Sequence, residues 1–327
     1  MNRLTRTLAV SSLAFLASLG STAQAQDAYP NHPIRLILGF SPGGISDVLG
    51  RTLANKVSQS IGQTIVVENK PGAGSNLAAD FVAKSPPDGY TIWLQDMTAH
   101  AINATMYKKL AFDPLKDFAP ITLVAYSPLM LVVNPKLPVN NVQELVAYLK
   151  ANGEKATYAS AGVGTANQIA AEMLKRAANV PNVVHVPYKG SAPSAQAVLA
   201  NEVTFSFLSM PPAVANVASG TMRGLAVTSA KRVPAVNNIP TMIESGFPGF
   251  DLVVYSGILA PAGTPPAIIA KLQAEFTKAA QSEDVIAAFA KIGAEPITNT
   301  PQAFAALMAS DIARLAPIVK ESGATAE

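Results

Sequence analysis

The chain has 327 residues, of which 49% are hydrophobic and 14% are charged, and it contains no cysteine. This composition excludes a disordered chain or a long coiled coil. The missing cysteines exclude a disulfide scaffold, a thiol nucleophile and cysteine-based metal sites. The length predicts about two domains with a large core.

Residues 1–25 have the pattern of a secretory signal peptide. Arg3 and Arg6 precede an apolar run over residues 7–20, and Ala23 and Ala25 supply the small residues of a cleavage site. The run is too short to span about 30 Å of hydrocarbon. We expect cleavage after Ala25, and export without disulfides suits a bacterial periplasm.

The formal charge is +3, from 24 basic and 21 acidic residues. Cleavage removes Arg3 and Arg6, which leaves 22 basic against 21 acidic residues, or +1. Lys and Arg do not cluster along the chain. A nucleic-acid or anionic-membrane surface needs a concentrated basic patch, so we exclude both partners.

The N-terminal part predicts alternating strands and helices. Residues 34–40 form an apolar run that ends in a Ser-Pro-Gly-Gly loop, and helical spacing follows as far as Gly62. Further strands are expected at 64–67 and 90–94, with a loop at 70–74 and a helix at 76–84 between them. This alternation indicates a parallel sheet with helices on its faces.

The middle of the chain repeats the pattern around a second glycine loop, at residues 161–165. Residues 121–133 predict a strand broken at Ser127-Pro128. The other elements expected here are a helix at 141–150, a strand at 157–160, a helix through 169–177, and strands at 183–186, 203–208 and 224–227.

The C-terminal part predicts a strand at 252–260 and two helices. Thr264-Pro265 and Thr300-Pro301 each combine an N-cap residue with proline at the first helical position. The absence of a low-complexity linker suggests that the chain crosses between two α/β lobes through strands, near residues 122–127 and 252–260.

Enzyme motifs are incomplete or absent. Gly72-Ala73-Gly74 and Gly162-Val163-Gly164 each begin a dinucleotide fingerprint but lack the third glycine. No Walker, His-Glu-x-x-His or Gly-x-Ser-x-Gly sequence occurs. We interpret His185 as a hydrogen-bonded histidine at a strand end rather than a base. We therefore predict no catalytic residue, metal site or cofactor.

The two glycine loops are the informative features, because each lies between a strand and a helix in a different half of the chain. Glycine admits a ligand close to the backbone, and a helix N-terminus offers free amides. The loops at 43–44 and 162–165 are either two anion cradles facing each other or tight βα turns. Asp47 can complement the dipole of its helix.

Several segments together resemble one family, the substrate-binding proteins of tripartite tricarboxylate transporters, also called Bug receptors. They include GFSPGGISDVLGRTLA (39–54), VVENKPGAGSNLAA (66–79), FDPLKDFAPITLVA (112–125), ASAGVGT (159–165) and HVPYKGSAPS (185–194). The shorter segments PPDGYT (86–91), LAVTSAKR (225–232) and APAGTPP (260–266) add to the match.

The resemblance implies a periplasmic receptor of the type II binding-protein fold, with two lobes that each have a central sheet flanked by helices and a ligand cleft between them. The oligomeric state is open, although a monomer suits lobe closure, and we expect a binding protein rather than an enzyme. Its lobes would be residues 26–124 plus 251–327 and residues 125–250. They would close over a small organic carboxylate and deliver it to the membrane subunits of a transporter. The ligand-binding positions that the resemblance implies are Pro42, Gly43, Gly44, Asp47, Thr98, Ala161, Gly162, Gly164, Thr165, Tyr188, Leu208 and Tyr255.

Three positions depart from the common pattern of the family. Gln168, Leu208 and Tyr255 stand where many relatives carry His, Asp and Trp. Because leucine cannot pair with a ligand ammonium, we expect an aromatic or alkyl carboxylate rather than an amino acid. The alternative is that Leu208 only packs the lobe.

Two other functions stay open. The protein could be the receptor of a two-component sensor. It could also be a periplasmic hydrolase, for which the sequence offers only His32, His100 and His185 as conventional bases.

Overall fold

The computed structural model describes residues 29–324 and residue 326. The predicted leader and the cleavage site after Ala25 lie outside the described residues.

Three strands and three helices alternate in the first part of the chain. They are β1 (Ile34–Leu38), α2 (Ile45–Ile61), β2 (Ile65–Asn69), α3 (Asn76–Ala83), β3 (Thr91–Asp96) and α4 (Met97–Met106). Both β2 and β3 pair with β1 in parallel, as the alternation predicted. Helix α2 ends at Gly62 in the left-handed conformation, which confirms the predicted stop.

Two long antiparallel strands contain the segments at which the chain was predicted to cross between lobes. They are β4 (Phe118–Val133) and β9 (Val253–Pro261). Strand β4 is continuous through Ser127-Pro128, so the predicted break is wrong. Pro128 makes the last pair of β4 with β9, and Leu129 makes the first pair with β7, so the residue without an amide hydrogen lies where β4 changes partner.

The middle of the chain supplies a second set of strands and helices. They are α5 (Val142–Asn152), β5 (Thr157–Ser160), α6 (Ala166–Ala178), β6 (Val184–Pro187), α7 (Ser191–Leu199), β7 (Phe205–Ser209), α8 (Met210–Ala218) and β8 (Arg223–Val227). The end of β4 pairs with both β7 and β8, and β5 pairs in parallel with β6 and β7.

The C-terminal segment packs back on the first set of elements. It contains α9 (Pro266–Ala280), α10 (Glu283–Lys291), β10 (Glu295–Pro296) and α11 (Pro301–Ser322). Thr300 caps α11 through a bond from the Ala303 amide, as predicted. The start of α9 is one residue later than predicted, with Pro265 as the cap.

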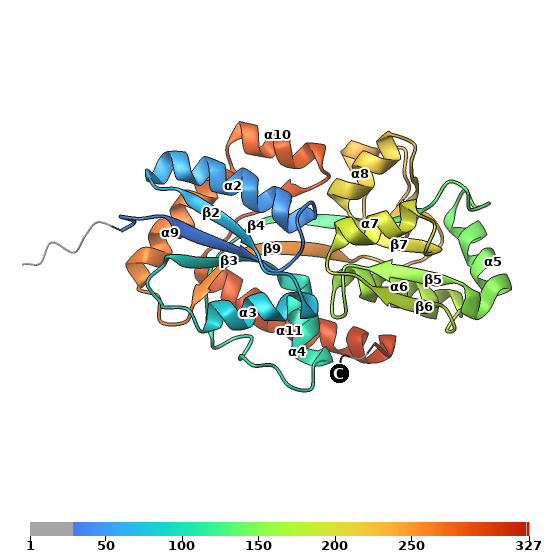
Figure 1. Cartoon of the computed structure of the whole chain (residues 1–327), viewed down its shortest axis with the longest axis horizontal. Helices are drawn as coiled ribbons and strands as arrows, with labels where there is room; N and C mark the ends of the chain where they lie inside the picture. Colours follow the sequence, from blue (N-terminus) through green and yellow to red (C-terminus); the bar gives the residue numbers. More distant parts are fainter. Residues whose placement is uncertain (1–28, 325, 327) are drawn as a thin grey trace, which may run out of the picture. The chain divides into compact units, whose positions relative to one another are not determined.

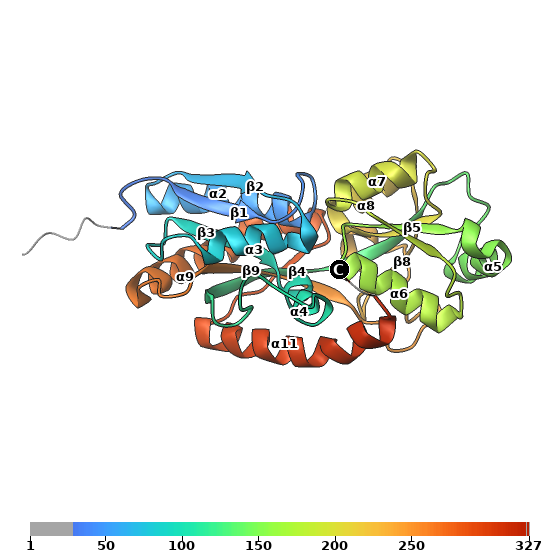
Figure 2. The same ribbon diagram turned by 60° about the horizontal axis from the view of Figure 1, so that its bottom comes forward.

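The strands form one mixed sheet in the order β2-β1-β3-β9-β4-β7-β5-β6, with β8 and β10 paired to β4. We call its two ends the β1–β3 half and the β5–β7 half. Figures 1 and 2 show helices around each half, with β4 and β9 running between them. This arrangement confirms the predicted α/β class, although the sheet is mixed rather than parallel.

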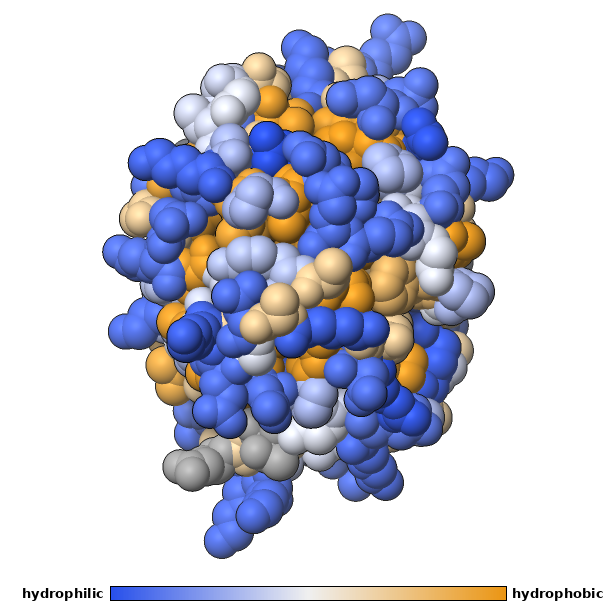
Figure 3. Space-filling view, turned by 90° about the vertical axis from the view of Figure 1, so that its right-hand side faces the viewer, coloured by the Kyte–Doolittle hydropathy of each residue, from blue (hydrophilic) through white to orange (hydrophobic). Residues whose placement is uncertain are grey.

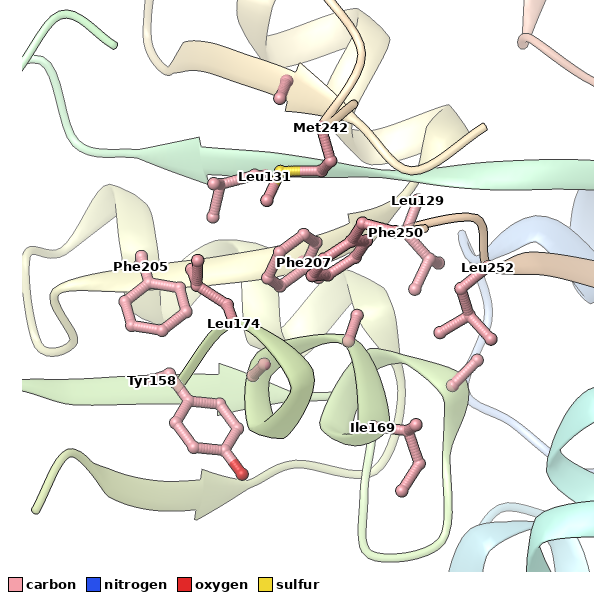
Figure 4. Close-up of a cluster of buried hydrophobic side chains, with 14 of the residues drawn as sticks. Leu129, Leu131, Tyr158, Ile169, Leu174, Phe205, Phe207, Met242, Phe250 and Leu252 are labelled. Carbon is pink, nitrogen blue, oxygen red and sulfur yellow. The ribbon is translucent and has the colours of Figure 1, made fainter. Parts of the chain in front are cut away.

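An aromatic cluster forms the core of the β5–β7 half. The rings of Phe207 and Phe250 stack with their centroids 5.8 Å apart, and Phe205 and Tyr158 extend the cluster toward β5 (Figure 4). The outer face of this half is mainly hydrophilic, with apolar residues dispersed among polar ones (Figure 3). Burial of each large side chain contributes about 1.5–3 kcal/mol.

Candidate functional site

The first glycine loop connects β1 to α2 and is held from behind by Asp47. The Asp47 carboxylate accepts hydrogen bonds from the Gly43 amide (3.1 Å) and from Arg51 Nε (3.0 Å). Burial alone would raise the pKa of this carboxyl, but the bonds from Arg51, Gly43 and Asn69 hold the pKa below its ordinary value. Gly43 has a φ of +86°, so the turn needs glycine there.

The second glycine loop connects β5 to α6 and is held in a similar way. The Thr165 hydroxyl donates to the Gly162 carbonyl oxygen (2.7 Å), and Gln168 Oε1 accepts from the Gly164 amide (2.9 Å). Gly162 and Gly164 have φ values of +134° and +80°. These contacts shape the loop from inside the protein.

The loops of the two halves touch each other. The Ser41 amide and hydroxyl both donate to the Lys189 carbonyl oxygen, at 3.1 and 2.6 Å. A Cβ atom at Gly74 would collide with the Val163 carbonyl oxygen, and one at Gly164 would collide with Asn103. The close approach of the halves therefore requires glycine at both positions.

An outer chamber of about 540 Å³ lies between these loops. It is lined by Phe40, the turn at residues 72–75, Tyr107, residues 161–163, residues 187–189 and Ala326. The lining comes from both halves of the sheet, so its shape depends on how the halves meet.

A small inner chamber of about 30 Å³ adjoins it. Phe40 and Ala161 line both chambers. The rest of the inner lining is Gly44, Ile45, Ser46, Asp96, Asn167, Ser191 and Ser209.

Helix N-termini converge on the inner chamber. Residues at the starts of α2, α7 and α8 line it, and among the described residues no side chain caps any of these three helices. The first amides of a helix have no partner within the helix and carry partial positive charge. The chamber is therefore an electropositive site suited to an anion.

Two residues of the inner lining have buried polar side chains. The Ser209 hydroxyl is buried and has no hydrogen-bond partner within the described part of the chain, and the residue is only 5% exposed. Asp96 is 6% exposed, and burial raises the pKa of its carboxyl to about 7. An incoming ligand can satisfy both groups.

Four of the twelve predicted site residues line the chambers, namely Gly44, Ala161, Gly162 and Tyr188. Four more shape the glycine loops without lining either chamber, namely Gly43, Asp47, Gly164 and Thr165. Pro42 is exposed on the first loop. The Thr98 hydroxyl donates to the Val253 carbonyl oxygen (3.0 Å) and joins α4 to β9.

The last two predicted residues lie elsewhere. Leu208 is fully buried in an apolar cluster with Met130 and Met210, and it lines neither chamber. Tyr255 lines a separate pocket together with Tyr126 and Glu295. The geometry therefore gives no support to the use of Leu208 in choosing among ligands, and the alternative that Leu208 packs the core fits its position.

Ser160 and His185 form a close pair, with Ser160 Oγ 2.6 Å from His185 Nε2. Ser160 is fully buried and its hydroxyl also bonds to the carbonyl oxygen and the amide of Gly162. The pair lines neither chamber and supports the second glycine loop from behind.

Sequence reasoning missed much of the inner lining. Asp96 and Ser209 are each the last residue of a strand and the N-cap residue of the helix that follows. Ligands of open α/β sheets bind outside the carboxyl ends of the strands, so this position was the available signal. The helix after Asp96 was not predicted, which hid the junction.

Comparison with known proteins identifies the family of this chain. The family model described as tripartite tricarboxylate transporter family receptor matches residues 49–324. Protein BugT of Bordetella pertussis is 36% identical over 324 residues, which cover 98% of each chain.

Solved structures of related proteins have the same fold as this chain. The structure of the periplasmic binding protein BugD has a TM-score of 0.88 and 33% identity, covering 91% of this chain and 100% of that one. A protein of R. palustris solved with adipate has a TM-score of 0.88 and 32% identity, covering 91% and 99%. The chain therefore belongs to the tripartite tricarboxylate transporter receptor family of periplasmic solute-binding proteins.

Proposed function

We propose that this protein captures a small organic carboxylate in the cleft between its two halves. The observation that carries this proposal is the convergence of the uncapped N-termini of α2, α7 and α8 on the inner chamber. Removal of a carboxylate from water needs several donors. The amides at the starts of α2 and α7 and the Ser209 hydroxyl can supply them. Helix α8 adds at most the Met210 amide, because Pro211 and Pro212 have no N–H and the Ser209 amide already donates to Ser191 Oγ.

The two chambers divide the ligand between them. The inner chamber, at about 30 Å³, suits one carboxylate group, and the outer chamber, at about 540 Å³, has room for the rest of the molecule. The adipate in the related R. palustris structure supports a carboxylate ligand for this chain.

Lobe closure is the proposed mechanism. The lobes are residues 26–124 plus 251–327 and residues 125–250, and β4 and β9 connect them. The bonds between Ser41 and Lys189 form only when the two loops meet. A ligand that contacts both lobes stabilises the closed form and shifts the equilibrium toward it.

The cellular role follows from the family and the leader. The signal peptide is cleaved after Ala25, and the mature protein acts as a monomer in the periplasm. It delivers its ligand to the membrane subunits of a tripartite tricarboxylate transporter. Loss of ligand uptake after deletion of the gene supports transport, whereas normal uptake with loss of a transcriptional response supports a two-component sensor.

The protein binds its ligand without converting it. The burial of Ser160 beneath the second glycine loop supports this view, because a nucleophile must reach the ligand. Ligand recovered unchanged from the incubated protein agrees with binding alone. A new product would support a hydrolase.

A thermal-shift screen tests the binding function directly. Mature protein is heated with mono-, di-, tri- and aromatic carboxylates, each beside its uncharged amide. A ligand at about 100 times its Kd stabilises the fold by about 2.7 kcal/mol. Stabilisation by an acid but not by its amide supports the proposal, and equal effects or none contradict it.

A charge substitution at the start of α2 tests the site. Ser46 is 3% exposed and lines the inner chamber. Ser46→Asp places a negative charge against the ligand carboxylate while it complements the helix dipole. We expect Ser46→Asp to lose ligand affinity, and Ser46→Asn, of similar size, to keep most of it. Equal affinities would place the anion elsewhere.

A further inference from the structure

Asp96 is an acidic residue in the lining of a chamber that is suited to an anion. It ends β3, and its Oδ1 accepts a hydrogen bond from the Ala99 amide (2.9 Å) at the start of α4. The Thr98 amide also bonds to the carboxyl. The side chain is thus held at the start of α4, and Asp96 is one of the residues that line the inner chamber.

No cation of the described chain compensates this carboxyl. None of the ion pairs among the described residues includes Asp96. Asp96 is also the one ionisable residue in the described lining of the inner chamber. The amides of Ala99 and Thr98 bond to this carboxyl, but a buried carboxylate without an opposite charge is still costly, so the site favours a compensating group.

The neighbouring charged and titratable groups face other partners. On α2, Asp47 bonds to Gly43 and Arg51. On α4, His100 Nε2 lies 2.8 Å from the Pro114 carbonyl oxygen. Tyr188 and Lys189, which precede α7, line the outer chamber. On β9, the residue paired with Asp96 is Ser256, which is uncharged.

We propose that Asp96 selects ligands that carry a hydrogen-bond donor, an ammonium or a hydroxyl group, beside the carboxylate. The ligand carboxylate accepts hydrogen bonds from the amides of the helix N-termini, and the ligand's donor group hydrogen-bonds to the Asp96 carboxylate. This assignment rests on the proposed function and names the ligand class: 2-amino or 2-hydroxy acids. It replaces the preference for plain alkyl or aromatic acids that Leu208 suggested.

A plain acid, which has no donor group beside its carboxylate, cannot compensate the charge of Asp96. Two carboxylates cannot share the chamber unless one of them is protonated. Burial already raises the pKa of Asp96 to about 7. A ligand without a donor therefore binds to the protonated protein, and above about pH 7 its affinity falls by up to about tenfold per pH unit.

Matched ligand series test the proposal. Each series has a plain, a 2-hydroxy and a 2-amino acid on one skeleton: succinate, malate and aspartate; glutarate, 2-hydroxyglutarate and glutamate; propionate, lactate and alanine; phenylpropionate, phenyllactate and phenylalanine. Calorimetry gives the Kd of the best series at about pH 6 and about pH 8.5. We expect a donor-bearing acid to bind at least about tenfold tighter than the plain acid at the higher pH, and the difference to shrink at the lower pH.

Two variants separate selectivity from folding. Asp96→Asn and Asp96→Ser both keep a residue that can cap α4. We expect either one to bring plain and donor-bearing acids within about threefold of each other at about pH 8.5. Asp311→Asn is the control, because Asp311 is equally buried, at 5% exposed, and lies on α11 outside both chambers. It should keep the preference.

The outcomes distinguish the two proposals. Equal binding of plain and donor-bearing acids by the native protein at about pH 8.5 overturns the role of Asp96 but leaves carboxylate binding intact. The same holds if both Asp96 variants keep the native preference. Binding of none of the series contradicts the proposed function itself.

Discussion

The carbonyl oxygen of Lys189 accepts two hydrogen bonds from Ser41, one from the amide at 3.1 Å and one from the hydroxyl at 2.6 Å. The two residues are 148 positions apart in the sequence, and Lys189 lines the outer chamber. Ser41 belongs to the loop after β1, and Lys189 precedes α7. The pair is thus a direct link between the two halves and is expected to break when the lobes open.

Removal of the Ser41 hydroxyl tests this link. One hydrogen bond contributes about 1 kcal/mol net, so Ser41→Ala should raise the Kd of the ligand about fivefold. Calorimetric titration measures the change. Ser85→Ala is the control, because the Ser85 hydroxyl donates to the Phe81 carbonyl oxygen just beyond the end of α3 (2.9 Å). An unchanged Kd in Ser41→Ala would show that the link does not contribute to closure.

Glycine is required where the halves approach most closely, so Gly164→Ala should weaken ligand binding strongly. The new Cβ collides with Asn103 from the other half, and the φ of +80° adds strain. The measurement is the Kd together with the melting temperature of the ligand-free protein.

Gly220→Ala is the matched control for the strain. Gly220 has a similar φ of +72°, and a Cβ there meets no described atom within 4 Å. Both variants should lose a similar, modest stability, but only Gly164→Ala should lose affinity. Equal affinities in the two variants would contradict a tight contact between the halves during binding.

Asp47 should link loop shape to acid stability. Its folded pKa lies below the ordinary value of 3.8, so the unfolded chain binds more protons as the pH falls. The stabilisation is present above about pH 4 and is lost as the pH falls through the folded pKa. In urea unfolding, Asp47→Asn should lower the free energy of unfolding at neutral pH. On acidification the variant should lose less stability than the native protein does. Parallel acid losses in both proteins would refute this role.

Local sequence signals located much of the fold. Glycine and proline at fixed places marked Gly62 as a helix end and Thr300-Pro301 as a helix start, because each acts through its own backbone. The two glycine loops were found for the same reason. The continuity of β4 was missed, because the local effect of Pro128 depends on which strand lies beside it.

Site residues were harder to predict than the loops that carry them. Asp47 and Thr165 are prominent in the sequence, yet they support the backbone from behind. Asp96 and Ser209 both line the inner chamber because β3 and β7, which are far apart in the sequence, end beside it. That convergence is a property of strand order, which short patterns do not determine.

In the ligand-free protein, the ionisation of Asp96 should make the free energy of unfolding depend on pH. The folded pKa of about 7 lies above the ordinary value of 3.8, so between these values the folded state holds more protons than the unfolded chain. Stability from this group therefore falls as the pH rises from about 4 to about 7. At about 1.4 kcal/mol per pKa unit, the loss amounts to about 4 kcal/mol.

Asp96→Asn removes this loss, because an amide does not ionise and can still accept the Ala99 amide bond. The free energy of unfolding in urea should therefore favour the variant over the native protein increasingly between about pH 4.5 and about pH 7.5. Taking the difference between the two proteins cancels the titration of all groups that they share. A constant difference across this range would mean that Asp96 is ionised throughout, with a compensating partner inside the ligand-free chamber.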